Sequence, residues 1–88
     1  MDIPILDNNK CSVLIAEYAT GIVCKGDLTL FLNDRDNESD VFQLFDDFSW
    51  AREFAIKLVK GRPEFECHIY DCNGNYLIGY SMKGELHY

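Results

Sequence analysis

One amphipathic helix is the feature that most constrains how this chain can fold. Phe48–Gly61 is the only segment whose apolar side chains repeat with a helical period, and Pro63 prevents the helix from continuing. Gly61 is a typical residue for the position just after a helix. The sequence therefore predicts a helix over residues 49–60 with one buried face. Five apolar residues at the spacing i, i+3, i+4, i+7 and i+8 form that face: Ala51, Phe54, Ala55, Leu58 and Val59.

Short runs of β-branched and apolar residues precede the helix and predict strands. The run Cys11–Tyr18 is apolar on both faces, which indicates a central strand or one covered on both sides. Val41–Phe45 is either a strand that leads into the helix or the turn before it. The predicted strands are 11–18, 22–24, 28–32 and 41–45.

A hairpin is predicted after the helix. Phe65–Tyr70 alternates apolar and polar residues, as a half-buried strand does. Asn73-Gly74 then favours a type I′ turn, because that turn needs positive φ at both central residues. A two-residue loop at this position sets the register, and each apolar residue meets another on the same face. The expected pairs are Ile69 with Ile78, Cys67 with Tyr80 and Phe65 with Met82.

The fold class follows from these elements. Residues 1–88 are expected to form a single α+β domain, since 88 residues do not supply two cores. We expect an antiparallel, curled sheet of about five or six strands in the order ββββ-α-ββ, packed against one helix. Residues 1–10 are predicted to form an N-terminal arm, and residues 83–88 are expected to fray. Since one helix covers one face of a sheet, the other face is either exposed or hidden by curvature. Tyr18, Phe31 and Leu77 are the residues concerned.

Negative charge is concentrated in one stretch of the chain. The formal net charge is −7, and residues 33–49 contain six acids and one base, which contribute −5 of it. The negative charge of the protein would repel the phosphates of a nucleic acid, so direct nucleic-acid binding is not expected. The N-terminus lacks the features of a signal peptide, and the longest apolar run is too short to span a bilayer. A cytoplasmic protein without a membrane partner is expected, and its four cysteines are then small hydrophobic residues.

Patterns for metal binding and catalysis are incomplete. Cys67-x4-Cys72 has no second cysteine pair of the kind that structural zinc sites use. The alternating acids from Asp34 to Asp40 resemble a calcium loop, but the glycine and the bidentate glutamate of an EF-hand are missing. His68 and Glu66 can be drawn as an acid–base pair, although a surface histidine opposite Leu77 or Gly79 is favoured. The sequence therefore predicts a protein that is not an enzyme, with no cofactor and no metal.

The acidic stretch is the most informative feature for function. It is either a solvated loop with helix-capping carboxylates, or an anionic, partly aromatic surface that fits a cationic cleft. The second interpretation predicts an inhibitor that sequesters a basic protein, such as a nuclease or other nucleic-acid-processing enzyme, of the toxin-immunity or phage anti-defence type. The alternatives are a homodimeric structural or regulatory domain that associates through an apolar sheet face, and a small-ligand or metal-binding domain. The expected partner-binding residues are Asp34, Asp36, Glu38, Asp40, Phe42, Asp46, Asp47 and Trp50.

Overall fold

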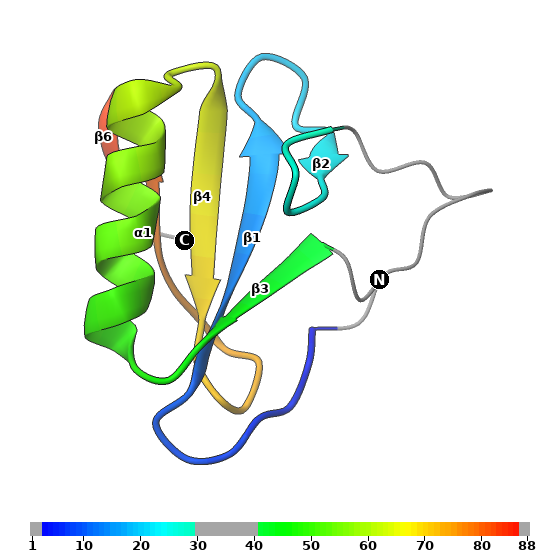
Figure 1. Cartoon of the computed structure of the whole chain (residues 1–88), viewed down its shortest axis with the longest axis vertical. Helices are drawn as coiled ribbons and strands as arrows, with labels where there is room; N and C mark the ends of the chain where they lie inside the picture. Colours follow the sequence, from blue (N-terminus) through cyan, green and yellow to red (C-terminus); the bar gives the residue numbers. More distant parts are fainter. Residues whose placement is uncertain (1–2, 30–40, 87–88) are drawn as a thin grey trace, which may run out of the picture.

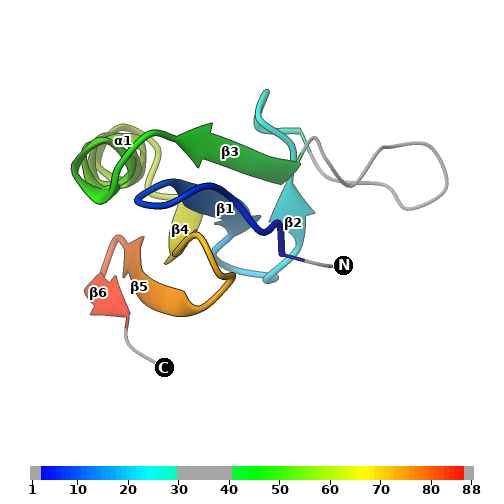
Figure 2. The same ribbon diagram turned by 90° about the horizontal axis from the view of Figure 1, so that it is seen from below.

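The computed structural model describes residues 3–29 and 41–86. In this part of the chain one helix lies against a six-stranded antiparallel sheet that curls around it (Figures 1 and 2). The sheet order is β2-β1-β4-β5-β6, and β3 also pairs with β1. The predicted α+β class, with a curled antiparallel sheet and one helix, is confirmed. The elements are β1 (Cys11–Glu17), β2 (Val23–Cys24), β3 (Phe42–Phe45), α1 (Phe48–Gly61), β4 (Phe65–Tyr70), β5 (Tyr76–Ser81) and β6 (Gly84–Leu86).

Helix α1 packs on the sheet through small side chains. Ala51 and Ala55 have no exposed surface, and Val59 is almost as deeply buried. Because alanine side chains are short, the helix axis can approach β4 and β1 closely. On the flank of this contact, Arg52 Nε donates a hydrogen bond to the Tyr80 hydroxyl at 3.1 Å. The predicted apolar stripe thus faces the core, and the helix extends one residue beyond the predicted range at each end.

Strand β1 is central, as its apolar faces predicted. One edge of β1 pairs with β4 along residues 12–17. The other edge pairs first with β3, from Cys11 to Leu14, and then with β2, at Ile15 and Ala16. Cys24 of β2 and Phe42 of β3 therefore pair with adjacent residues of β1. In effect β2 and β3 are two halves of one edge strand, which is interrupted between Cys24 and Phe42.

The residues directly after β2 differ from the sequence prediction. Leu28, the first residue of the strand predicted over 28–32, has a φ of +69°, and its amide bonds the carbonyl oxygen of Lys25. The Asp27 carboxylate accepts hydrogen bonds from both the amide and the hydroxyl of Thr29. An aspartate that bonds the backbone two residues ahead favours a turn over a strand. Residues 28 and 29 are therefore in a turn region, and residues 30–32 lie outside the described residues.

The β4–β5 hairpin has the predicted register but a different turn. The Gly74 amide bonds the Asp71 carbonyl oxygen, and the Asp71 amide bonds that of Asn75, so the loop contains three residues. Only Gly74 of the expected two residues has positive φ, at +83°. This is a three-residue loop in which a glycine forms the bulge, not a type I′ turn. A second irregularity, which leaves Leu77 without a partner in β4, restores the expected pairs Ile69–Ile78 and Cys67–Tyr80.

The C-terminal end forms a further strand in place of the expected fraying. β6 pairs with β5 through Gly84–Ser81, Glu85–Tyr80 and Leu86–Gly79. Gly84 has a φ of +110°, which suits the tight connection between the two strands. The predicted pairing of Phe65 with Met82 is wrong, because Met82 lies in this connection and is exposed. Residues 87 and 88 lie outside the described residues.

The sheet face that α1 does not cover is only partly exposed. On β1 this face carries Ser12 and Ala16, and both are buried. Of the three residues predicted to line it, Tyr18 is half-buried, Leu77 is exposed and Phe31 lies outside the described residues. The N-terminal arm runs across the lower end of the sheet in Figure 1, where the Leu6 amide bonds the Cys72 carbonyl oxygen at 2.8 Å. No helix in the described part of the chain is long and apolar enough to cross a membrane.

Candidate functional site

Three large apolar side chains are exposed in the short segment where β3 leads into α1. Leu44 is 60% exposed, Phe48 38% and Trp50 62%, although all three lie within seven residues of one another. Asp46 lies in the same segment, and its side chain is 91% exposed. We call residues 44–50 the corner segment. Its large exposed apolar side chains and its exposed carboxylate make this segment a candidate for protein binding.

A helix cap fixes the geometry of the corner segment. Asp47 is the N-cap residue of α1, and its carboxylate accepts a hydrogen bond from the Trp50 amide at 2.9 Å. The Asp47 backbone is extended, so the chain turns sharply there from the strand into the helix. This turn places Phe48 and Trp50 in the first helical turn. The two neighbouring carboxylates therefore differ: Asp47 holds the helix start and Asp46 points into solvent.

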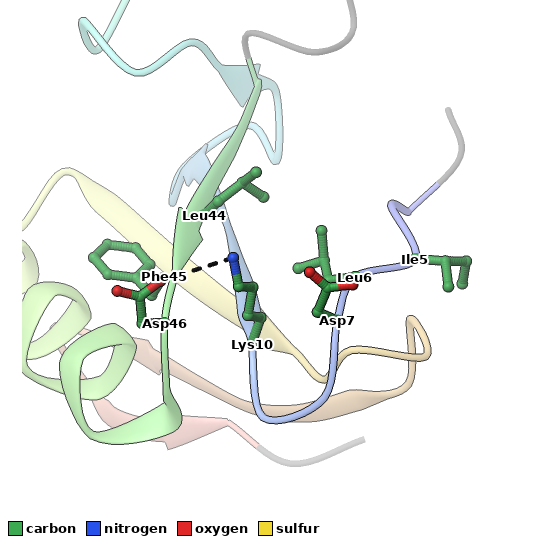
Figure 3. A pocket seen from close by; sticks show the side chains of 7 residues that line it. All are labelled: Ile5, Leu6, Asp7, Lys10, Leu44, Phe45 and Asp46. Atoms are coloured by element: carbon green, nitrogen blue, oxygen red, sulfur yellow. Dashed lines mark ion pairs between the residues drawn. The ribbon is translucent and has the colours of Figure 1, made fainter.

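A small hollow lies between the N-terminal arm and β3, and we call it the arm–β3 hollow (Figure 3). Its volume is about 240 Å³. Lys10 stands inside it with Nζ 3.9 Å from Asp46 Oδ1, at the long limit for an ion pair. One wall is held by the core, because the Phe45 ring packs against Phe54 with centroids 5.1 Å apart. The lining residues are Ile5, Leu6, Asp7, Lys10, Leu44, Phe45 and Asp46.

A second hollow of about 530 Å³ lies on the other side of Lys10. It is bounded by the start of α1 and the β4–β5 turn. Two carboxylates line it, Asp47 and Asp71. Asp71 accepts hydrogen bonds from the amides of Asn73 and Asn75, both at 2.9 Å. The pKa of Asp71 is lowered from its usual value, mainly by the hydrogen bond from the Asn75 amide. Both carboxylates of this hollow therefore already serve as backbone caps.

The predicted site residues are placed unequally by the structure. Asp47 and Trp50 are joined by a hydrogen bond in the corner segment, Asp46 of the same segment faces Lys10, and Phe42 lies half-buried in β3 opposite Leu14. Asp34, Asp36, Glu38 and Asp40 lie outside the described residues, and their proposed role stays a sequence-based prediction.

Sequence reasoning missed several members of this site. Leu44 and Phe48 were not selected, and neither were Asp7 and Lys10 of the arm. Their sequence signal is weak, because exposure of Leu44 depends on which edge of the sheet β3 occupies, and the arm reaches β3 only through tertiary structure.

A second polar group lies on the sheet face away from α1; the sequence suggested its Glu66–His68 pair but not its third member, Tyr76. His68 Nδ1 is 2.9 Å from the Tyr76 hydroxyl, and His68 Nε2 is 3.4 Å from Glu66 Oε1. The side chains of His68 and Glu66 are only 12% and 16% exposed, so the expectation of a surface histidine is wrong. His68 pairs with Gly79 in the neighbouring strand, and the missing Cβ of Gly79 leaves room for the Tyr76 hydroxyl.

This carboxylate–imidazole–phenol chain can fix the histidine tautomer and relay a proton. However, Glu66 and His68 are nearly covered, and a substrate would have to displace their neighbours to reach them. The arrangement therefore fits a structural hydrogen-bond network between β4 and β5 better than a catalytic centre.

The cysteines are free thiols, and three of them are buried: Cys11, Cys24 and Cys67. Burial raises the pKa of the Cys67 thiol to about 12, so it is neutral near pH 7. Only Cys72, in the β4–β5 turn, is partly exposed. Within residues 3–29 and 41–86, no three His, Cys, Asp or Glu side chains come together in a way that could hold a metal ion.

No family model, no curated protein and no solved structure that we compared with the chain matches it.

Proposed function

We propose that this protein is a non-enzymatic inhibitor that sequesters a basic protein partner through the corner segment. A nuclease or another nucleic-acid-processing enzyme is the expected class of partner, as for proteins of the toxin-immunity or phage anti-defence type. One observation carries the proposal: Leu44 and Trp50 are exposed in the same seven-residue segment as the Asp46 carboxylate, which is itself 91% exposed. The chain has a net charge of −7, which favours a partner of opposite sign.

Apolar burial supplies the affinity in this proposal. Tryptophan side chains bury about 150–250 Å² when covered. Because Trp50 is 62% exposed, covering it is worth roughly 2–4 kcal/mol at about 25 cal/mol per Å². Exposed aromatic side chains of this kind are frequent binding hot spots, particularly when polar groups surround them. The surrounding carboxylates then steer the basic partner and fix its orientation.

Affinity purification from the lysate of the native host tests the proposal. Wild-type protein should retain a basic, nucleic-acid-processing enzyme at low salt and release it as salt rises. The Trp50→Ala variant should lose that enzyme. Leu77→Ala is the matched control, because Leu77 is also a large exposed apolar residue but lies on β5, outside the corner segment. With the purified enzyme, the wild type should then inhibit activity at a stoichiometric ratio.

Three results would contradict this function. The first is retention of no protein by the wild type at any salt concentration. The second is equal retention of the same enzyme by wild type and Trp50→Ala. The third is a tight, salt-insensitive dimer in light scattering, because self-association would then explain the exposed apolar residues.

A further inference from the structure

We infer that the arm–β3 hollow is a socket for a single arginine side chain of the basic partner. This inference rests on the proposed function for the nature of the partner. It goes further by naming the group that is recognised and the residues that recognise it.

The size of the hollow fits a side chain. Its volume of about 240 Å³ lies below the roughly 300–1,000 Å³ that is usual for sites of small-molecule ligands and cofactors. Its lining is partly apolar, from Leu6 on the arm and Leu44 on β3, and partly polar, from Lys10 and the two carboxylates. Apolar walls suit the methylene groups of a long cationic side chain, whose charged end remains at the opening.

The charge of the hollow selects a cation. Two carboxylates, Asp7 and Asp46, line it together with one cation, Lys10. Figure 3 shows Lys10 rising between Asp46 on one side and Asp7 on the other. Among the described residues, no group donates a hydrogen bond to the carboxylate of Asp7. A planar guanidinium with five N–H donors can serve two carboxylates at once, whereas an ammonium group acts as a point charge.

Lys10 occupies the socket only loosely. Its Nζ lies 3.9 Å from Asp46 Oδ1, and the side chains are 43% and 91% exposed. Exposed ion pairs with this geometry contribute little. A partner arginine can therefore displace Lys10, which moves into solvent without leaving a buried charge behind.

The frame around the hollow is already fixed. β3 is bonded to β1 along residues 42–45, and the arm is held by the hydrogen bond from Leu6 to Cys72. A preformed site loses little conformational freedom on binding. The neighbouring, larger hollow is a poorer socket, because its carboxylates, Asp47 and Asp71, already accept backbone hydrogen bonds.

Titration of the ¹⁵N-labelled protein with N-acetyl-arginine methylamide tests the socket. N-acetyl-citrulline methylamide is the neutral control, since it has nearly the same shape. We expect saturable amide shifts at Leu6, Asp7 and residues 44–46, with a Kd on the order of 1–10 mM for such a small probe. The citrulline probe and N-acetyl-lysine methylamide should bind at least about fivefold more weakly.

Variants separate recognition from general charge. Asp46→Asn should weaken arginine binding by about fivefold or more, while Glu53→Gln, an equal charge change on the exposed face of α1, should not. Lys10→Gln should strengthen binding about two- to fivefold, because it removes the competing cation. Lys57→Gln is the control for that charge change. A purely structural role for Lys10 predicts no gain.

The inference is overturned if the arginine probe shows no saturable shifts, or shifts residues outside the hollow. It is also overturned if the citrulline or lysine probe binds equally well, or if Lys10→Gln binds no tighter than Lys57→Gln. These results leave the proposed function standing if the wild type still retains its enzyme through Trp50. Conversely, arginine binding without any retained enzyme supports the socket and contradicts the function.

Discussion

Replacing Asp47 by alanine tests the division of roles between the two carboxylates at the corner segment. The Asp47 side chain accepts the Trp50 amide at 2.9 Å and so satisfies a donor at the start of α1. Loss of such a cap costs about 1 kcal/mol, and loss of a negative charge at the helix N-terminus adds a few tenths. For a domain of this size, about 1–1.5 kcal/mol lowers the melting temperature by roughly 4–10 °C. Thermal and urea denaturation followed by circular dichroism measure both quantities.

Neighbouring variants make the test specific. Asp47→Ser keeps a capping oxygen and should recover most of the loss. Asp46→Ala should change the free energy of unfolding by less than about 0.5 kcal/mol, because its carboxylate is 91% exposed and its ion pair with Lys10 is long, at 3.9 Å. The reasoning is refuted if Asp47→Ala is as stable as the wild type. It is equally refuted if Asp46→Ala is destabilised as much as Asp47→Ala.

Three further substitutions test the sheet. Gly79→Ala should cost about 1–3 kcal/mol, because its Cβ would collide with the Tyr76 hydroxyl; Gly61→Ala, with open space at its Cβ, should cost nothing. Ser12→Ala should stabilise the protein by about 1 kcal/mol, because the buried Ser12 hydroxyl has no hydrogen-bond partner in the described structure; destabilisation would contradict this. The raised pKa of Cys67, from 9.0 to about 12, means that the unfolded chain releases this proton first. The free energy of unfolding should therefore fall as pH rises from about 9 to 12, and in urea titrations it should fall less in Cys67→Ala.

The local parts of the fold were predictable because their signals lie within a few residues. The helix follows from the spacing of Ala51, Ala55 and Val59, and all three are buried. The hairpin register was correct for Ile69–Ile78 and Cys67–Tyr80, since alternation along both strands sets which residues meet. The turn type was wrong, yet the register survived. The loop has one residue more than predicted, which shifts the pairing by one residue. The unpaired residue Leu77 shifts it back, so the pairs beyond Leu77 are the predicted ones.

Strands that depend on distant partners were less predictable. Residues 28 and 29 have the apolar and β-branched character of a strand, but the side chain of Asp27 bonds Thr29 and closes a turn. β6 is only three residues long, and Gly84–Leu86 has no alternation to reveal it. Its existence depends on a free edge of β5, which sequence spacing does not disclose.

The candidate site follows from topology more than from composition. The acidic stretch led to the prediction of Asp46 and Trp50 as binding residues. The neighbouring sequence does not show that Asp46 and Asp47 have different roles; the position of the helix start does, because it makes Asp47 the N-cap residue. In the same way, Leu44 belongs to an apolar run and reads as a core residue. It is exposed because β3 is one half of a split edge strand, with β1 on one side and the arm across a hollow on the other. An edge strand that runs directly into a helix leaves alternate side chains and the first helical turn uncovered together. The corner segment thus combines one residue of an edge strand with two residues of the first helical turn, and none of the three belongs to the core.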